Sequence, residues 1–354
     1  MTPGQSALSV SFATAGLGAA LLVAGPVSEV LGRTPLMHAS LFAAALVAIA
    51  GGLSPGWNAL LGLRLVEGIV LAGLPAVAMA YLAEEVHPRA TARVAGLYIG
   101  GTAIGGMSGR LVTGALAEFG GWRAALVGIG ALCLVCAVAV WFLLPRSRRF
   151  TPAPASAAHL LDAARTILRD PAYLCLFGVA GTSMGAFVGV FNAMGFRLMA
   201  PPYGLGVGAV GLVFLTYALG SVSSAYAGRA ASRWGQRAVM PVCVLVMAAG
   251  LLVTLAGPVL VVVLGLAVMT AGFFAVHGVA SGWVAARAAK GGAAKGQASS
   301  GYLFAYYAGS SVFGAVAGIA WAQGAWSVVV ALCAALVAVT LVLSLVLRRI
   351  PKLA

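Results

Sequence analysis

Between two apolar runs, each long enough to cross a membrane, stands Gly25-Pro26-Val27-Ser28-Glu29-Val30-Leu31-Gly32-Arg33-Thr34-Pro35. Two glycines, two prolines and two opposite charges fall within these eleven residues. A weaker copy, GRAASRWGQR at residues 228–237, follows 203 positions later and also separates two apolar runs. The pattern predicts a tight charged turn between two membrane spans, repeated in a second half of the chain.

The composition excludes a soluble globular protein. Hydrophobic residues make up 62% of the chain and charged residues only 8%, whereas soluble domains carry about 25% charged residues. The net charge of +14 comes from small basic clusters between apolar runs. Because nucleic-acid binding needs a contiguous solvated basic surface, we exclude it. The five cysteines all lie inside apolar runs, so we interpret them as buried small side chains and predict no metal and no cofactor.

Apolar runs of about 20 residues are long enough to span a bilayer. Eleven qualify: 8–28, 36–54, 59–82, 93–115, 124–144, 173–196, 207–228, 238–256, 259–283, 299–320 and 326–347. The predicted domains are an N-terminal bundle (1–145), a linker (146–172), a C-terminal bundle (173–347) and a tail (348–354).

Basic residues predict the orientation, because basic loops stay cytoplasmic. Of the 21 lysines and arginines, 17 fall on alternate connections. The linker and the C-terminus are therefore expected on the cytoplasmic side of the inner (plasma) membrane.

Further matches between the halves extend the repeat. At an offset of 204, Tyr98 aligns with Tyr302, Gly105 with Gly309 and Trp122 with Trp326. Two halves in the same order indicate a parallel repeat about an axis along the membrane normal. The partner of segment 173–196 would precede Met1, so we expect a twelve-helix design without its first helix.

Several short motifs resemble those of the major facilitator superfamily. They are GPVSEVLGR at residues 25–33, RLVEG at 64–68, YLAEEVHP at 81–88, GGMSGR at 105–110, GFRLMAPP at 195–202 and GFFAVH at 272–277. Within that superfamily the chain is similar to the drug/proton-antiporter-like branch, whose members are often labelled arabinose-efflux-like permeases. The resemblance implies an all-α membrane fold of two six-helix bundles. It also implies proton-driven transport of a small molecule by alternating access, by a monomer that is not an enzyme.

The turn at residues 25–35 corresponds to the family's cytoplasmic gate signature, with Val30 and Thr34 in place of two basic residues. Glu29 can cap a helix or pair with Arg93. The alternative is an ordinary solvated turn. The predicted gate residues are Gly25, Glu29, Gly32, Arg33, Arg93, Arg233 and Gly235. Glu84 and Glu85 either pair with Arg89 and Arg93 or are solvated.

Arg64 and Glu67 lie three residues apart inside a span and can pair on one helix face. The family assigns this arginine to proton coupling, and a structural ion pair is the alternative. His277 is a third coupling candidate, because histidine titrates near neutral pH; a histidine bonded to backbone is its alternative.

The antiporter glycine pattern is matched by Gly96, Gly105, Gly109 and Gly114, which we expect to pack against a neighbouring helix. Arg110 replaces its proline and either faces the substrate cavity or extends to the surface. The other cavity candidates are Asn192, Tyr302, Tyr306 and Tyr307. The two adjacent tyrosines point about 100° apart, so one of them is expected to face the cavity.

The sequence favours a secondary transporter. It holds no phosphate-binding loop for ATP. Few acids and an intramembrane arginine favour sugars, neutral drugs or organic anions over organic cations. The alternatives are a non-transporting membrane protein, because the first helix is absent, and, more remotely, a membrane-embedded enzyme.

Overall fold

A computed structural model describes residues 3–86, 88–148, 150, 165–291 and 295–351, and every regular element in these ranges is a helix. Nine of the described helical stretches are long and apolar enough to cross a membrane. Two of them, Ile104–Leu143 with 40 residues and Gln297–Arg349 with 53, are about twice the length that one span needs.

Each long stretch contains a break in its helical backbone. Gly121 has a φ of 69°, and Gly324 and Ala325 leave the helical region, Ala325 with a φ of 53°. Counted as two spans each, the long stretches bring the described spans to eleven, at the places predicted from the apolar runs. The predicted all-α membrane fold is confirmed.

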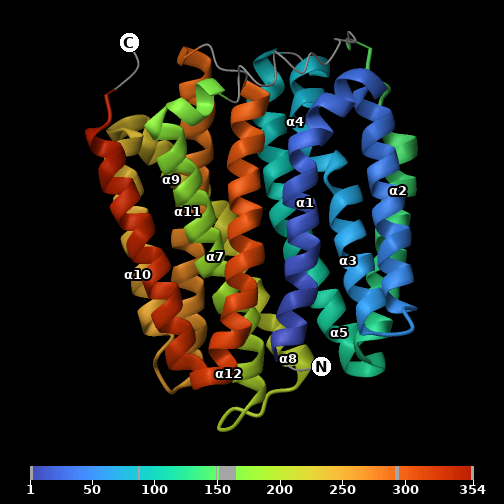
Figure 1. The fold of residues 1–354 in the computed structure, drawn as a ribbon, viewed down its shortest axis with the longest axis vertical. Coiled ribbons are helices and arrows are strands. Elements are labelled where there is room, and N and C mark those ends of the chain that lie inside the picture. The colour runs from blue at the N-terminus through green and yellow to red at the C-terminus, as the bar shows by residue number, and fades with distance from the viewer. Residues whose placement is uncertain (1–2, 87, 149, 151–164, 292–294, 352–354) are drawn as a thin grey trace. The chain divides into compact units, whose positions relative to one another are not determined.

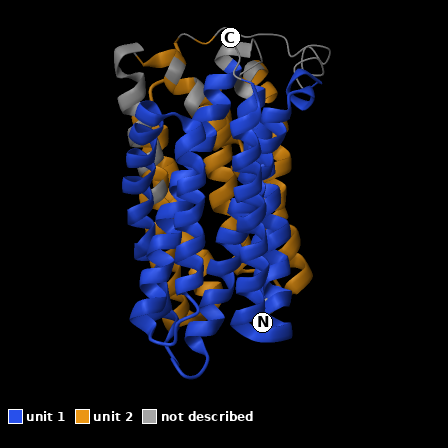
Figure 2. Ribbon diagram, turned by 90° about the vertical axis from the view of Figure 1, so that its left-hand side faces the viewer, with its two compact units in different colours: residues 1–11, 163–354 blue, residues 12–162 orange. Residues whose placement is uncertain are grey.

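The chain forms two compact units, residues 12–162 and residues 1–11 with 163–354 (Figure 2). We call them unit 2 and unit 1. Unit 2 contains α1 (Pro3–Leu31) from Phe12 onward, α2 (Arg33–Gly52), α3 (Trp57–Leu71), α4 (Gly73–Glu85) and α5 (Pro88–Leu143) (Figure 1). Unit 1 contains α7 (Pro171–Met199), α8 (Val207–Gly211), the 3₁₀ helix η1 (Leu212–Tyr217), α9 (Ala218–Trp234), α10 (Gln236–Val253), α11 (Val259–Gly291) and α12 (Lys295–Arg349).

In unit 2, α2 packs against α3, α4 and α5. Glycine allows the close contact between α2 and α5. A Cβ atom on Gly52 would lie 2.9 Å from the carbonyl oxygen of Arg123, and one on Gly130 would lie 2.9 Å from the amide nitrogen of Ile49. Small residues of this kind let two helix backbones approach closely. Within a bilayer such packing holds helices together, because lipid tails provide no hydrophobic driving force between them.

In unit 1, α7 runs beside α12, and α10 beside α11 (Figure 1). Gly181 and Gly309 leave no room for a side chain between α7 and α12. An aromatic cluster joins α7 to α11, with the rings of Phe187 and Phe273 stacked 4.0 Å apart. The first turns of α1 belong to this unit: the Ser311 hydroxyl donates to the carbonyl of Ser11 at 2.7 Å.

The predicted turn at residues 25–35 is wrong in its extent. The helix α1 continues to Leu31 with Pro26 inside it, and α2 begins at Arg33. An internal proline removes one helical hydrogen bond and its ring crowds the carbonyl four residues earlier, but membrane helices tolerate it. The turn is therefore the single residue Gly32. The predicted span 59–82 also differs in detail, because Ala72 separates α3 from α4.

Candidate functional site

Gly32 and Gly235 occupy equivalent places in the two units and adopt nearly the same backbone conformation. Gly32 has φ 91° and ψ 154°, and Gly235 has φ 85° and ψ 145°. L-residues rarely adopt such a positive φ, so glycine is required at both positions. Gly25, by contrast, lies in helical backbone, and a Cβ atom there would meet nothing within 4 Å. No close helix contact is therefore present at Gly25 within the described residues.

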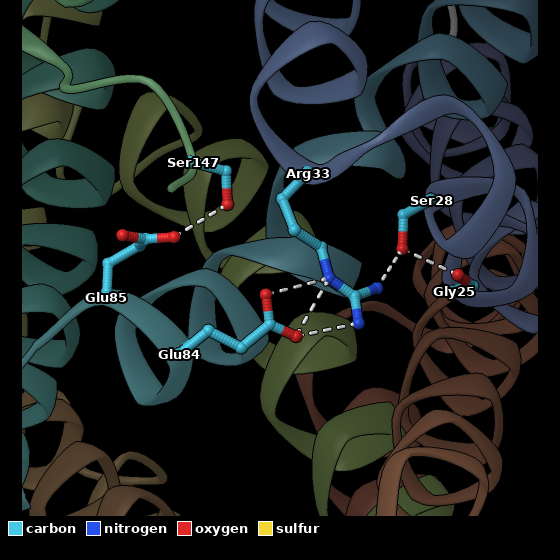
Figure 3. A network of polar contacts seen from close by, with 6 residues as sticks. All are labelled: Gly25, Ser28, Arg33, Glu84, Glu85 and Ser147. Atoms are coloured by element: carbon cyan, nitrogen blue, oxygen red, sulfur yellow. Dashed lines mark hydrogen bonds and ion pairs between the residues drawn. The ribbon is translucent and has the colours of Figure 1, made fainter. Parts of the chain in front are cut away.

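Arg33 begins α2 and binds the end of α4. Its Nε and Nη2 atoms donate to Oε1 of Glu84 at 3.2 and 2.9 Å (Figure 3). The remaining nitrogen, Nη1, donates to the hydroxyl of Ser28, which itself donates to the carbonyl of Gly25 at 2.6 Å. The side chains of Arg33 and Glu84 are only 13% and 28% exposed. This charge-assisted fork ties the α1–α2 turn to α4.

Glu85, which follows Glu84 directly, binds a different partner at the same end of unit 2. Its Oε1 atom accepts a hydrogen bond from the Ser147 hydroxyl at 2.9 Å (Figure 3). The same atom accepts a second hydrogen bond from the Arg148 amide at 2.7 Å. The Ser147 amide donates to Thr34 at 3.1 Å. The two adjacent carboxylates therefore fasten two separate segments, the α1–α2 turn and the chain that follows α5.

The predicted gate is only partly within the described structure. The side chains of Glu29, Arg89 and Arg93 lie outside the described residues, so their predicted pairings stay predictions. In unit 1, the guanidinium of Arg233 lies 5.4 Å from the ring centre of Trp234. Asp170 is the acid of this unit that the structure describes, and it binds Arg287 rather than Arg233. The Nε–Oδ2 distance is 2.6 Å and the Nη2–Oδ1 distance is 2.9 Å.

Asp170 also caps α7. Its Oδ1 atom accepts from the amide of Ala172 at 2.9 Å, and Pro171 is the first helical residue. A carboxylate at a helix N-terminus satisfies a free N–H group and complements the helix dipole. The pair therefore links the start of α7 to α11, where Arg287 lies.

Arg64 and Glu67 form an ion pair inside a predicted span, as expected from their spacing. The Nη1–Oε2 distance is 2.6 Å, and each side chain is 19% exposed. Counted from Trp57, the two residues lie roughly 10 and 15 Å along α3, at 1.5 Å per residue. The Nε atom of Arg64 is buried and has no hydrogen-bond partner among the described residues. The pair thus leaves one donor of the guanidinium unused.

A close contact between α1 and α3 supports this pair. Gly68 directly follows Glu67, and a Cβ atom there would collide with the carbonyl of Ala13 on α1. A Cβ atom on Gly16 of α1 would likewise collide with the carbonyl of Leu65. Glycine at these two positions lets α1 lie against the turn of α3 that carries the ion pair.

His277 lies beside two tyrosines of α12 that are predicted cavity residues, Tyr302 and Tyr306. Its Nδ1 atom is 3.0 Å from the hydroxyl of Tyr302, whose side chain is buried. The His277 ring centre is 4.8 Å from that of Tyr306, and Tyr307 packs edge-on against Tyr306 at 5.2 Å. The histidine is therefore bonded to a side chain, and the backbone bond considered as its alternative is not present among the described contacts.

Polar atoms without partners lie buried in the same unit. They include Nδ2 of Asn192 on α7, Oγ1 of Thr270 on α11 and Oγ of Ser310 on α12, none of which has a hydrogen bond within the described structure. Buried donors of this kind are costly unless a ligand or water completes them. Asn192 is thus the predicted cavity residue with an unused donor.

The sequence of this chain is similar to those of known membrane proteins. The sequence profile of the Major Facilitator Superfamily matches residues 1–206. The MFS-type transporter YybF of Bacillus subtilis (strain 168) is 40% identical over 353 residues, which cover 100% of this chain and 87% of YybF. The chain belongs to the Major Facilitator Superfamily. This confirms the family that the sequence motifs predicted.

Further relatives place this superfamily member among membrane transporters. The inner membrane transport protein YnfM of Escherichia coli (strain K12) is 40% identical over 349 residues, covering 99% of this chain and 83% of YnfM. A bacterial homolog of the human lysosomal transporter Spinster has the same fold, with a TM-score of 0.77 at 15% identity over 99% of this chain and 90% of that one. The nucleoside transporter NupG gives 0.74 at 14% identity, with 98% and 91% covered.

In α5 of this superfamily member, the structure places Arg110 and two of the predicted packing glycines. Arg110 is exposed, and its Nη1 atom lies 3.4 Å from the carbonyl of Gly106 on its own helix. A Cβ atom on Gly105 would meet nothing within 4 Å, and one on Gly109 would meet only Ile129 at 4.0 Å. No close helix contact is present at these two glycines within the described residues. Gly96 and Gly114 also lie in α5, and their packing role stays a prediction.

Sequence reasoning missed the acidic partners in both units of the superfamily fold. The sequence indicated neither the bond of Glu84 to Arg33 nor the bond of Asp170 to Arg287. One signal was present: Glu84 and Arg287 are 203 residues apart, the offset of the repeat. Each stands near the end of the equivalent helix, with opposite charge. The opposite charges of Glu84 and Arg287 at equivalent positions indicate that each residue binds a charged partner from another part of its unit.

Proposed function

We propose that this superfamily member is a secondary transporter that exports a small molecule in exchange for protons. The observation that carries the proposal is the ion pair of Arg64 and Glu67 in the middle of a span, at 2.6 Å and with little exposure. Ionisable residues at such depth are costly and mark coupling or substrate sites. A proton on Glu67 removes its negative charge and frees Arg64 to bind an anionic group or water.

The proposed orientation places the C-terminus and the 146–172 linker in the cytoplasm of the cell, at the inner membrane. The basic connections support it. On that side, the Arg33–Glu84 pair would hold unit 2 in one state of an alternating-access cycle. Contacts of this kind stabilise one state and must break in the other.

We further propose a neutral or anionic substrate, in the class of sugars, neutral drugs and organic anions. Of the seven acids in the chain, Glu67 alone lies in the middle of a span, where Arg64 neutralises it. Asn192, His277 and Tyr302 supply hydrogen-bonding groups without adding negative charge. Among the described residues, an organic cation would find no free acid at that depth.

Counterflow in proteoliposomes tests transport, with a panel of sugars, organic anions and drugs as substrates. A pH gradient then tests coupling and direction. An antiporter accumulates substrate when the vesicle interior is acidic, because protons leave as substrate enters. Accumulation with an alkaline interior would instead indicate uptake together with protons, and would contradict the proposed export.

Substitution of Glu67 separates coupling from binding. We expect Glu67→Gln to keep counterflow, because exchange needs no net proton movement, and to lose accumulation driven by the pH gradient. Glu118→Gln is the matched control, since Glu118 is an exposed acid of the same unit beside the break at Gly121. Gradient-driven accumulation that survives in the Glu67→Gln variant would remove Glu67 from the coupling mechanism.

A further inference from the structure

A pocket of about 800 Å³ lies among the ends of four helices of unit 1, α9, α10, α11 and α12. Its wall carries Arg237, Arg287 and Arg348 together with Trp234 and Trp283. No acid is among the described residues that line it. The pocket is therefore positively charged, with indole rings beside the charges.

Two of the three arginines keep their charge uncompensated. Arg287 is neutralised by Asp170 through two short contacts. Among the described residues, Arg237 donates only to the neutral backbone carbonyls of Arg348 and Ile350. The exposed guanidinium of Arg348 has no hydrogen bond or ion pair within the described part of the chain. A ligand that reaches this wall meets two cations.

An apolar groove of about 510 Å³ adjoins the basic pocket and shares two of its lining residues, Trp234 and Ala238. The groove follows α9, α10 and α11 away from the arginines, and no charged residue is among its described lining. Its side includes Tyr226, which is 65% exposed, as Trp234 is at 64%. A cation stacks on each ring, Arg229 on Tyr226 and Arg233 on Trp234, both at 5.4 Å.

We propose that the basic pocket and the apolar groove together bind one anionic phospholipid. The phosphate would lie at Arg237 and Arg348, and an acyl chain would follow the groove past Trp234. The inference goes beyond the transport function and rests only on the protein being in a membrane. Basic pockets between spans bind anionic head groups, and tryptophan and tyrosine favour the level of the head groups.

The continuity of the two hollows distinguishes a lipid from a free anion. A free phosphate would use the arginines and leave the groove uncovered. An apolar chain alone would gain nothing from Arg237 and Arg348. Only an amphiphile with a negative head uses both, and the anionic lipids of the membrane supply that chemistry without a further partner.

Native mass spectrometry of the full-length protein in detergent tests the proposal. Dioleoyl phosphatidylglycerol is titrated against phosphatidylcholine with the same chains, with inorganic phosphate and dioleoylglycerol as competitors. Because each arginine near the surface contributes about a fivefold gain in affinity for an anionic lipid, we expect phosphatidylglycerol to bind more than about tenfold more tightly than phosphatidylcholine. We also expect neither competitor to displace it.

Three variants locate the site. Arg348→Gln should weaken phosphatidylglycerol binding about fivefold and leave phosphatidylcholine unchanged. Arg349→Gln is its matched control, because it removes the neighbouring charge, which does not line the pocket. Gly282→Leu keeps every charge and fills the pocket, since a Cβ atom there meets nothing within 4 Å; it should also lower binding.

Equal binding of the two lipids would overturn the proposal, as would an Arg348→Gln variant that binds like the parent protein. Displacement of phosphatidylglycerol by inorganic phosphate would indicate a free-anion site and also overturn it. Weakening by Arg349→Gln as strong as by Arg348→Gln would show a diffuse charge effect rather than a built pocket.

Discussion

Arg33 and Glu84, 51 residues apart in the chain, form a forked ion pair in which two guanidinium nitrogens reach one carboxylate, at 2.9 and 3.2 Å. The third nitrogen of the guanidinium binds Ser28. All three elements that meet at the turn, α1, α2 and α4, are thus joined by one side chain. Because the pair is largely shielded from water, it should contribute more than an exposed surface pair.

We expect Arg33→Gln and Glu84→Gln each to lower the free energy of unfolding by about 1–3 kcal/mol, because each leaves a shielded charge without its partner. Unfolding in mixed micelles with increasing SDS measures the change. Glu118→Gln should have little effect, because Glu118 is exposed. If the double variant is destabilised by the full sum of the two single changes, the residues are not coupled and the pair does not stabilise the turn.

Backbone conformation, rather than space, should decide the effect of alanine at two glycines of unit 1. Gly235→Ala places a Cβ atom at φ 85° and ψ 145°, a conformation essentially restricted to glycine, and should cost about 1–3 kcal/mol. Gly228→Ala, seven residues earlier in helical α9, should instead stabilise by about 0.5–1 kcal/mol. A Cβ atom at either position meets nothing within 4 Å. The same SDS titration should give opposite signs; equal effects would mean that the positive φ carries no strain.

The contact between α1 and α3 predicts a difference between two glycines of the same helix. Gly68→Ala should destabilise unit 2 by about 1–3 kcal/mol, because the added methyl group collides with the backbone of α1 at Ala13. Gly62→Ala is the control, since a Cβ atom there meets nothing within 4 Å. Thermal unfolding followed by tryptophan fluorescence measures both. A Gly68→Ala variant as stable as Gly62→Ala would contradict the tight approach of the helices.

The hydrogen bond between His277 and Tyr302 should be measurable by removing one hydroxyl. Tyr302→Phe should lower stability by about 0.5–1.5 kcal/mol, because a buried histidine nitrogen loses its partner. Tyr307→Phe removes a hydroxyl from the same helix without affecting that bond. If His277 lies in the substrate site, Tyr302→Phe should also raise the half-saturating substrate concentration in counterflow, and Tyr307→Phe much less. Equal effects of the two variants would contradict a specific role for the bond.

The spans could be predicted from the sequence because the thickness of the bilayer fixes their length. The residue at which α1 ends could not be predicted in this way. Gly25 and Pro26 are turn signals, yet membrane helices tolerate proline in their interior, and the positive φ that ends the helix falls at Gly32. The ion pair of Arg64 and Glu67 was predictable, since residues three apart on a helix share a face.

Partners from different helices were not predictable from local spacing. Glu84 lies one residue from Glu85, and only the packing of α4 determines that the first binds Arg33 and the second binds Ser147. The packing partners of the glycine pattern in α5 were not predictable from spacing either. Spacing identifies a stripe of small residues, whereas the close contacts of unit 2 that the structure describes involve Gly16, Gly52, Gly68 and Gly130.

The breaks at Gly121 and at Gly324–Ala325 join two spans within each of α5 and α12 almost without a loop. The two spans of each pair can then rotate relative to each other about a hinge at the break. At 1.5 Å per residue, a pivot of about 5° at the break shifts the far end of a 20-residue span by about 2.6 Å. That displacement is comparable to the length of a hydrogen bond. A small rotation at a backbone break is therefore enough to make or release a polar contact on the opposite side of the membrane.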